Sequence, residues 1–370
     1  MKDVFRKVII LIAFFLCIST STLNAQILRD SSSLSLVKVT IDDIYNLRFS
    51  AAHEVLRKLN LSYPGHPVIY VLKGMITYWE NYPLISSSPA RVSFENDLLK
   101  CIELCDEKHN PADAAEFLLA NLSARGLLLL FYTDNNINKE VIPLAVSTYQ
   151  YIRRSFDYIS YYTDFYFFTG LYNYYRVAYP EAYPVYKSLA FLFPKGDRIK
   201  GLNDLHTAAA NSLLFKAEAS SFLSAICLSF ENNYEQAYEH SKYLHELYPS
   251  NIQYLSMFIK NLLLIKQYDE AESHLKYMDS LNGNSYNRAQ LAIFSGILQE
   301  KKYHNNKMAE NYYLKGINEM LTFGYLGNDF AAYGYFGLSR ISKLNNDDIS
   351  SKTYLKKAIE MADFKNVNFN

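Results

Sequence analysis

The sequence is poor in the residues that interrupt helices. Its 370 residues include only 13 glycines and 10 prolines, both below average usage. Scarcity of these residues favours long uninterrupted elements, because glycine and proline are the least favourable residues in a helix interior. No stretch shows the sustained apolar–polar alternation that is typical of strands. The sequence therefore predicts an all-α fold.

A charge bias and a cysteine framework are also missing. Lys plus Arg and Asp plus Glu both number 37, so the formal net charge is zero. Nothing in that balance favours nucleic acid as a partner. Beyond Cys17 the chain has Cys101, Cys105 and Cys227, an odd number that argues against a disulfide framework. We interpret these three as buried small apolar residues rather than as a metal or redox site.

The familiar catalytic motifs are absent. The chain has no glycine-rich nucleotide loop, no His-Glu-x-x-His pattern, no nucleophile elbow and no paired-cysteine zinc spacing. His240 and His274 occupy matching positions but lack a carboxylate partner at ligand spacing. Asp197, after Gly196, is interpreted as a helix N-cap. We therefore predict a protein that is not an enzyme and that uses no cofactor and no metal.

The first 25 residues have the layout of a secretory signal peptide. A positively charged start precedes the unbroken apolar run 8–18, and Ala25 offers a small residue for cleavage. The run is too short to span a bilayer comfortably. Residues 1–25 are thus predicted as a signal peptide and residues 26–38 as a flexible, Ser-rich lead-in. We expect a periplasmic protein without a membrane span in the mature chain, and leave open its association with the outer membrane or its secretion.

An internal repeat is the strongest signal that the sequence does contain. Residues 232–251, NNYEQAYEHSKYLHELYPSN, align with residues 266–285, KQYDEAESHLKYMDSLNGNS. Their shared positions, among them Ala237 and Ala271, are 34 residues apart, which is the period of a two-helix repeat. A small residue at these positions allows two helix axes to approach closely. The pattern predicts stacked, antiparallel helix pairs.

This pattern resembles the tetratricopeptide repeat family. Residues 218–251 supply its small, aromatic and closing positions, and looser matches cover most of residues 40–363. The matching residues of the best repeat are Ala225, Tyr234, Ala237, Leu244 and Pro249. The resemblance implies a right-handed α-solenoid of antiparallel helix pairs, here over residues 39–365.

A weaker resemblance lies in the middle of the chain. It is to a tetratricopeptide subgroup that includes eukaryotic inclusion-body-clearance proteins and uncharacterised secreted bacterial proteins. The matching residues are Gly170, Asn173, Gly196, Asp197, Arg198, Gly201, Leu202 and Leu205. This subgroup offers no catalytic residues to carry over, so the resemblance bears on the fold alone.

Tyrosine is the abundant residue, with 33 in the chain. Most are interpreted as packing between helices, since the ring is apolar and the hydroxyl can stay wet. The family's alignment places a minority of aromatic residues, with two basic ones, on the concave face. These candidate partner-binding residues are Tyr78, Trp79, Phe167, Tyr174, Tyr175, Lys260 and Arg340.

Two functions remain open at this point. The first is an exported, non-catalytic scaffold that holds a protein or peptide partner from the cell envelope in its concave groove. The alternative is a carbohydrate or small-ligand binding protein that uses the aromatic residues of the groove.

Overall fold

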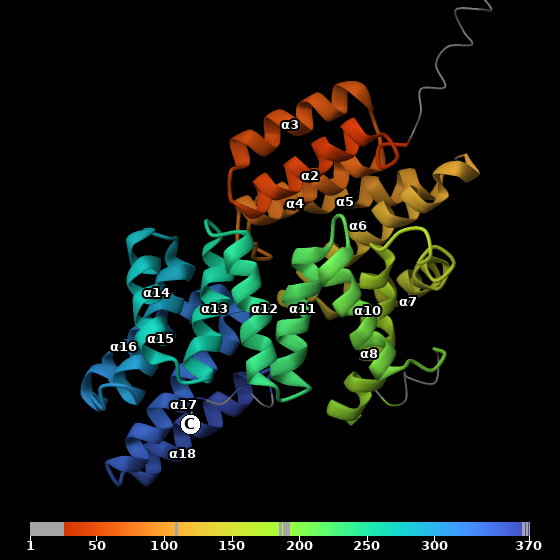
Figure 1. The fold of residues 1–370 in the computed structure, drawn as a ribbon. Helices are drawn as coiled ribbons and strands as arrows, with labels where there is room; N and C mark the ends of the chain where they lie inside the picture. The colour runs from red at the N-terminus through yellow and green to blue at the C-terminus, as the bar shows by residue number, and fades with distance from the viewer. Residues whose placement is uncertain are drawn as a thin grey trace, which may run out of the picture.

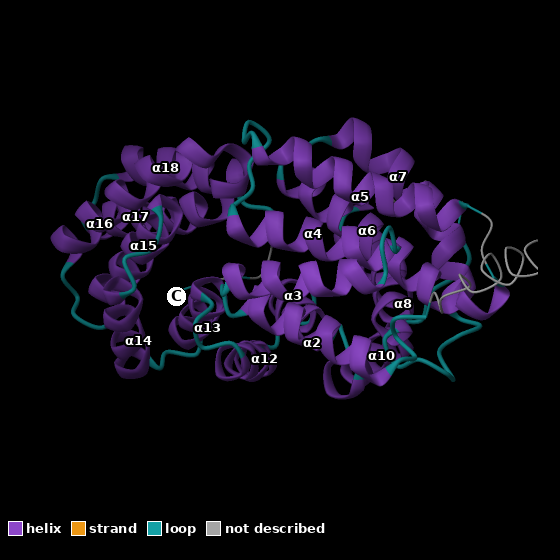
Figure 2. Ribbon diagram, turned by 90° about the horizontal axis from the view of Figure 1, so that it is seen from above, coloured by secondary structure: helices purple, strands orange, loops and turns teal. Residues whose placement is uncertain are grey.

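The computed structural model describes residues 26–107, 110–184, 187, 193–364, 367 and 369. The predicted signal peptide, residues 1–25, lies outside that range. None of the described residues lies in a strand, so the all-α prediction is confirmed for this part of the chain. Consecutive helices pack against one another and follow a curved path (Figures 1 and 2).

The helices have the following bounds: α2 (Ser31–Tyr45), α3 (Phe49–Ser62), α4 (Pro67–Glu80), α5 (Ala90–Asp106), η1 (Pro111–Asp113), α6 (Ala114–Asp134), α7 (Asn138–Ser155), α8 (Phe165–Ala182), α10 (Arg198–Asn211), α11 (Lys216–Ser229), α12 (Tyr234–Leu247), α13 (Ile252–Leu264), α14 (Tyr268–Ser280), α15 (Ser285–Lys301), α16 (Asn306–Met320), η3 (Leu321–Gly327), α17 (Asn328–Leu344) and α18 (Asp348–Met361).

Small residues lie where paired helices touch. Ala237 of α12 and Ala271 of α14, the alanines of the 34-residue repeat, are fully buried. A Cβ atom on Gly201 of α10 would lie 2.4 Å from the backbone nitrogen of Tyr174 in α8. The predicted role of small residues in close helix approach is therefore confirmed at these contacts.

The start of α10 follows the predicted cap. The Asp197 carboxylate accepts a hydrogen bond from the Lys200 backbone N–H at 2.9 Å. This bond satisfies one of the donors that a helix start leaves free. The interpretation of Asp197 as an N-cap is confirmed.

The predicted lead-in differs from the structure. Residues 31–38 belong to α2, whose start is capped by Asp30 through the Ser33 backbone N–H at 2.9 Å. Ile27 is fully buried, and its backbone N–H donates to Glu116 at 2.9 Å. Serine-rich sequence here begins a helix instead of forming a flexible linker, because serine and aspartate hydroxyl and carboxylate groups favour helix starts.

The N-terminal helices lie against the middle of the chain. The Asn251 amide donates to the Tyr45 carbonyl oxygen at 2.9 Å, and the Asn284 amide donates to the Tyr82 carbonyl oxygen at 2.7 Å. Trp79 packs between these regions, with ring centroids 5.6 Å from both Tyr45 and Tyr254. Figure 1 shows α2 to α4 lying across the end of the α11 to α13 helices.

The most apolar helical stretch runs through the interior. Residues Pro111–Asp134, which comprise η1 and α6, are long and apolar enough to cross a membrane by length and composition. However, 67% of the most apolar window is buried inside the structure, as in the core helix of a globular domain. Helix α6 contributes to two apolar clusters, one with α2 to α5 and one with α8, α10 and α11.

Two glycine substitutions test the close-contact argument. We expect Gly201→Ala to lower the free energy of unfolding by about 1–3 kcal/mol, because the new methyl group would overlap the α8 backbone. We expect Gly126→Ala in α6 to raise it by about 0.4–1 kcal/mol, since no atom lies within 4 Å of a Cβ there. Urea unfolding of both variants measures the difference. Equal effects of the two changes would contradict the argument.

Candidate functional site

The predicted partner-binding residues do not share one open surface. They are spread over α4, α8, α13 and α17. Tyr78 is 7% exposed and Tyr174 is fully buried, so neither side chain presents an open surface in this structure. Trp79 is half-buried and stacks on Tyr82 with ring centroids 5.5 Å apart. The sequence alignment could not anticipate these positions, because it contains no information on which distant helices cover them.

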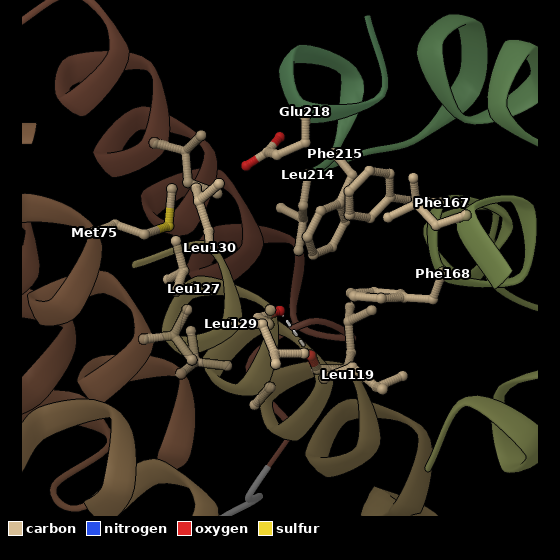
Figure 3. A pocket seen from close by; sticks show the side chains of 18 of the residues that line it. Met75, Leu119, Leu127, Leu129, Leu130, Phe167, Phe168, Leu214, Phe215 and Glu218 are labelled. Carbon is tan, nitrogen blue, oxygen red and sulfur yellow. Dashed lines mark hydrogen bonds between the residues drawn. The ribbon is translucent and has the colours of Figure 1, made fainter. Parts of the chain in front are cut away.

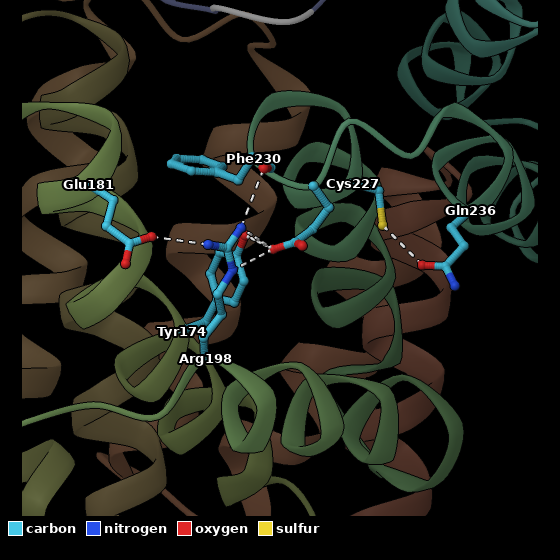
Figure 4. A network of polar contacts seen from close by, with 7 residues as sticks. Tyr174, Glu181, Arg198, Cys227, Phe230 and Gln236 are labelled. Atoms are coloured by element: carbon cyan, nitrogen blue, oxygen red, sulfur yellow. Dashed lines mark hydrogen bonds and ion pairs between the residues drawn. The ribbon is translucent and has the colours of Figure 1, made fainter.

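Tyr174 belongs to a polar network that joins α8, α10 and the end of α11 (Figure 4). Its hydroxyl donates to Glu231 at 2.5 Å, and the Arg198 guanidinium donates to the same carboxylate oxygen at 2.9 Å. Arg198 also pairs with Glu181 at 3.0 Å. Tyr175 is half-buried beside this network, edge-on to Phe230 with centroids 5.6 Å apart. The network is a structural connection between neighbouring helix pairs.

Arg340 is engaged in a second network. Its guanidinium donates to both oxygens of Glu300, at 2.7 and 2.8 Å. The buried Tyr313 hydroxyl donates to the same carboxylate at 2.7 Å. A bidentate, charge-assisted pair of this kind orients α15 and α17. In this structure the Arg340 guanidinium thus connects two helices, and its partner-binding role stays a prediction.

Lys260 differs from the other predicted residues. It is half-buried, and the part of the chain that the structure describes provides no hydrogen bond or ion pair to its ammonium group. Burial nevertheless lowers the pKa of Lys260, and Asp329 partly opposes this effect. The ammonium group of Lys260 is therefore partly shielded from water and has no bonded counter-charge among the described residues.

Two acidic residues and two aromatic rings belong to the same electrostatic cluster as Lys260. Asp329 interacts electrostatically with Lys260 and with Asp134. Burial raises the pKa of Asp134 to about 7. The rings of Tyr82 and Tyr286 lie edge to face, with centroids 6.0 Å apart. We name the half-buried charges Lys260, Asp134 and Asp329 the central charged cluster.

Phe167 lines a different site, an apolar cavity of about 390 Å³. It lies where α2, α4, α6, α8 and the start of α11 meet (Figure 3). Phe167 stacks on Phe215 in its wall, with ring centroids 5.3 Å apart and planes inclined by 12°. The other apolar side chains of the wall include Val71, Met75, Leu119, Leu127, Leu130, Phe168 and Leu214.

Two carboxylates line the cavity. One of them, Glu116, is hydrogen-bonded to groups of the surrounding fold through both oxygens. Glu116 accepts hydrogen bonds from the backbone N–H groups of Ile27 and Leu28, at 2.9 and 3.0 Å. The His66 Nε2 atom is 3.1 Å from the same carboxylate. Since His66 Nδ1 accepts from the Val68 N–H at 3.3 Å, Nε2 carries the proton. Glu116 therefore secures the N-terminal segment.

Glu218 is the other carboxylate and has a free oxygen. The Tyr45 hydroxyl donates to Oε1, whereas Oε2 is buried and has no hydrogen-bond partner. Burial raises the pKa of Glu218 to about 7, and the Tyr45 hydrogen bond only partly opposes this effect. In Figure 3 the carboxylate points from α11 into the space beside Met75 and Leu130. An acceptor of this kind in an apolar cavity can bind a donor group.

The loop before α11 sets the position of Glu218. The buried Asp164 carboxylate accepts from the Ser212 hydroxyl at 2.6 Å and from the Leu214 N–H at 2.7 Å. The Ser212 oxygen in turn accepts from the Phe215 N–H at 2.8 Å. These bonds hold Leu214 and Phe215 in the cavity wall and fix the first turn of α11.

Gly126 lies on the face of α6 that lines the cavity. A Cβ atom there would meet no atom within 4 Å. At the other glycines within α-helices, a Cβ would come within 3.0 Å of a neighbour. Gly126, Leu130 and Thr133 are exposed and line the cavity, which makes this side of α6 its mouth. Helix packing thus gives no reason for glycine at position 126, whereas an open cavity does.

Sequence reasoning missed Tyr45, Glu218 and Gly126. One signal was present: Gly126 interrupts the helix-favouring run LLANLSARGLLLLF, residues 118–131, where glycine costs about 1 kcal/mol relative to alanine. Nothing in the sequence connects Tyr45 with Glu218, because 173 residues separate them.

The described cysteines and the histidines at positions 240 and 274 lie outside the cavity wall. Cys101, Cys105 and Cys227 are free and buried, which confirms their interpretation as small apolar residues. His240 lies beside His206, with ring centroids 5.4 Å apart, and His274 beside His245, at 5.3 Å. Among the residues that the structure describes, no group of three or more His, Cys, Asp or Glu is arranged to hold a metal ion.

Comparisons with known proteins found no matching family model, curated protein or solved structure. The functions of the cavity and of the central charged cluster are therefore inferred from the residues that form them.

The raised pKa of Glu218 predicts a pH dependence of stability. The folded protein keeps this carboxyl protonated up to about pH 7, against an ordinary pKa of 4.5. Between pH 4.5 and about 7 the folded state therefore holds one proton more than the unfolded state. The free energy of unfolding decreases as the pH rises through this interval. We expect the wild type to lose roughly 2–3 kcal/mol more unfolding free energy than Glu218→Gln between about pH 4.5 and 7.5.

Urea unfolding at both pH values measures this difference. The exposed Glu239 supplies the matched control, since Glu239→Gln should keep the wild-type pH dependence. If Glu218→Gln follows the wild type as well, burial does not protonate Glu218.

Proposed function

We propose that this protein is a non-catalytic binding protein that holds a small apolar ligand in the cavity between α4, α6 and α8. The observation that carries the proposal is a space of about 390 Å³ whose wall is almost wholly aliphatic and aromatic. Its size falls within the range of about 300–1,000 Å³ that is usual for ligand pockets. Apolar cavities of this kind exclude water and bind apolar molecules.

The polar groups of the wall argue against a carbohydrate. A sugar requires several hydrogen-bonding groups around its hydroxyls, but Glu116 is already fully bonded. The hydroxyls of Ser123 and Thr148 donate to carbonyl oxygens of their own helices, at 2.7 and 2.6 Å. Of the two small-ligand classes, the cavity favours the apolar one.

The absence of a reactive pair supports a binding role. Among the described lining residues there is no histidine, cysteine or lysine, and the only carboxylates are Glu116 and Glu218. General acid–base or nucleophilic catalysis needs a group positioned against its partner, which these residues do not supply.

The wider architecture and location also belong to this proposal. Consecutive packed helices and the 34-residue repeat support a right-handed, tetratricopeptide-like solenoid. The signal-peptide pattern of residues 1–25 supports export to the periplasm, with the bound ligand held in the cell envelope.

The cavity proposal predicts that its mouth can be blocked. We expect Gly126→Phe to weaken binding of the apolar dye N-phenylnaphthylamine at least tenfold, because the ring would enter the open space beside α6. Val92 of α5 is 61% exposed and lies outside the cavity wall, so Val92→Phe serves as the control. Fluorescence titration gives both affinities. Unchanged binding to Gly126→Phe would exclude this cavity as the dye site.

A second candidate function is a scaffold for a protein or peptide partner. The central charged cluster favours it, because Lys260 there has no ion pair among the described residues and interacts electrostatically with Asp329. Asp134 of the same cluster acts on Tyr82 and Tyr286, whose rings touch each other. An unpaired ammonium group in a cluster that includes aromatic residues can bind a carboxylate of a peptide segment.

Site-specific cross-linking in intact cells tests the scaffold function. A photoreactive residue in place of Tyr82 should form an adduct with a partner chain, and Lys260→Met should reduce that adduct at least fivefold. The same residue in place of the 78% exposed Tyr161 reports nonspecific capture. Adducts of equal yield at both positions would argue against partner binding at the central charged cluster.

A further inference from the structure

The two oxygens of Glu218 are in different states, and this asymmetry identifies the kind of ligand head group. Oε1 accepts from the buried Tyr45 hydroxyl. Oε2 is buried and has no hydrogen-bond partner. Buried carboxylate oxygens in proteins are nearly always bonded. An unpartnered one that lines a cavity marks the position where a bound molecule supplies the missing donor.

The charges near Glu218 determine which head groups fit. The described residues that line the cavity include no lysine and no arginine. The charged group that acts on Glu218 is another carboxylate, Asp164. When Glu218 is ionised, above its pKa of about 7, an anionic head such as a fatty-acid carboxylate would meet only negative charge and acceptor oxygens. A head that donates a hydrogen bond, whether neutral or cationic, would find an acceptor that nothing else occupies.

The rest of the wall determines the shape of the ligand. Leucine side chains of α6 line the cavity together with Glu218, and Figure 3 shows Met75 on one side of them and Phe168 on the other. None of these side chains offers a hydrogen-bonding group. The wall therefore fits one continuous apolar body with a single polar end.

We propose that the cavity binds an apolar molecule with one hydrogen-bond-donating head, a hydroxyl or an ammonium group, which donates to Oε2 of Glu218. This assignment rests on the proposed function of the cavity and adds the chemistry of the ligand. The apolar body lies along α6 toward Gly126. Tyr45 is a positioning residue, since its hydroxyl occupies Oε1 and leaves Oε2 directed at the ligand.

Displacement of bound N-phenylnaphthylamine by three ten-carbon compounds tests the assignment. Decanol and decylamine carry donor heads, and decanoate carries an anionic acceptor; each is used below its aggregation concentration. At about pH 8.5, above the pKa of about 7 of Glu218, the carboxyl is ionised and Oε2 can only accept. We expect the wild-type protein at this pH to bind decanol and decylamine at least tenfold more tightly than decanoate. Decanol binding with weak decylamine binding would identify a hydroxyl head, and the reverse result an ammonium head.

The Glu218→Gln variant provides the sharper comparison. Its amide oxygen can still accept from Tyr45, which leaves the amide N–H₂ as a donor at the former Oε2 position. We therefore expect the preference to reverse, with decanoate binding improved at least fivefold and decylamine binding weakened at least tenfold. Retained dye affinity shows that the variant keeps the cavity.

The outcomes separate the two proposals. If the dye and all three compounds fail to bind the wild type, the cavity function itself is wrong. If the three compounds bind equally well to the wild type, the cavity function stands and the role of Glu218 is overturned. That second result needs only the wild-type protein, so it decides the question even if Glu218→Gln does not fold.

Discussion

Close contact between neighbouring helices is the constraint on which this structure depends. Gly201 of α10 lies so near the α8 backbone that a Cβ would be 2.4 Å from the Tyr174 nitrogen. Gly296 of α15 faces the Tyr313 ring in the same way, at 2.6 Å. These close contacts fix the separation of the two helices in each pair.

Helix α6 forms the central wall of the apolar cavity. Helix α6 belongs both to the apolar cluster of the N-terminal helices and to the cluster around α8 and α11. The two clusters meet along its length without filling the space between them. A protein interior is normally packed to high density, so an unfilled apolar volume beside an unobstructed glycine, Gly126, points to a site and not to a packing fault.

The two carboxylates that line the cavity, Glu116 and Glu218, differ in their hydrogen bonds and therefore in their roles. Glu116 accepts from two backbone N–H groups and lies against His66, so it secures the N-terminal segment. Glu218 has the same side chain in the same cavity, but its Oε2 has no hydrogen-bond partner, whereas Tyr45 donates to Oε1. The same residue type therefore has two different roles in this cavity. The role of each glutamate depends on how many donors the surrounding structure provides to its carboxylate.

The sequence alone determined the elements: helices without strands in the described chain, the cap at Asp197, and the burial of Ala237, Ala271 and the three later cysteines. These features depend on neighbours within one helix or one repeat, which periodicity records. Tertiary structure decided the rest. Folding of α2 to α4 onto α13 and α15 packs Trp79 against Tyr254 and brings Tyr45 to Glu218. Such contacts join residues that are far apart in the chain, and no local pattern encodes which distant surfaces will meet.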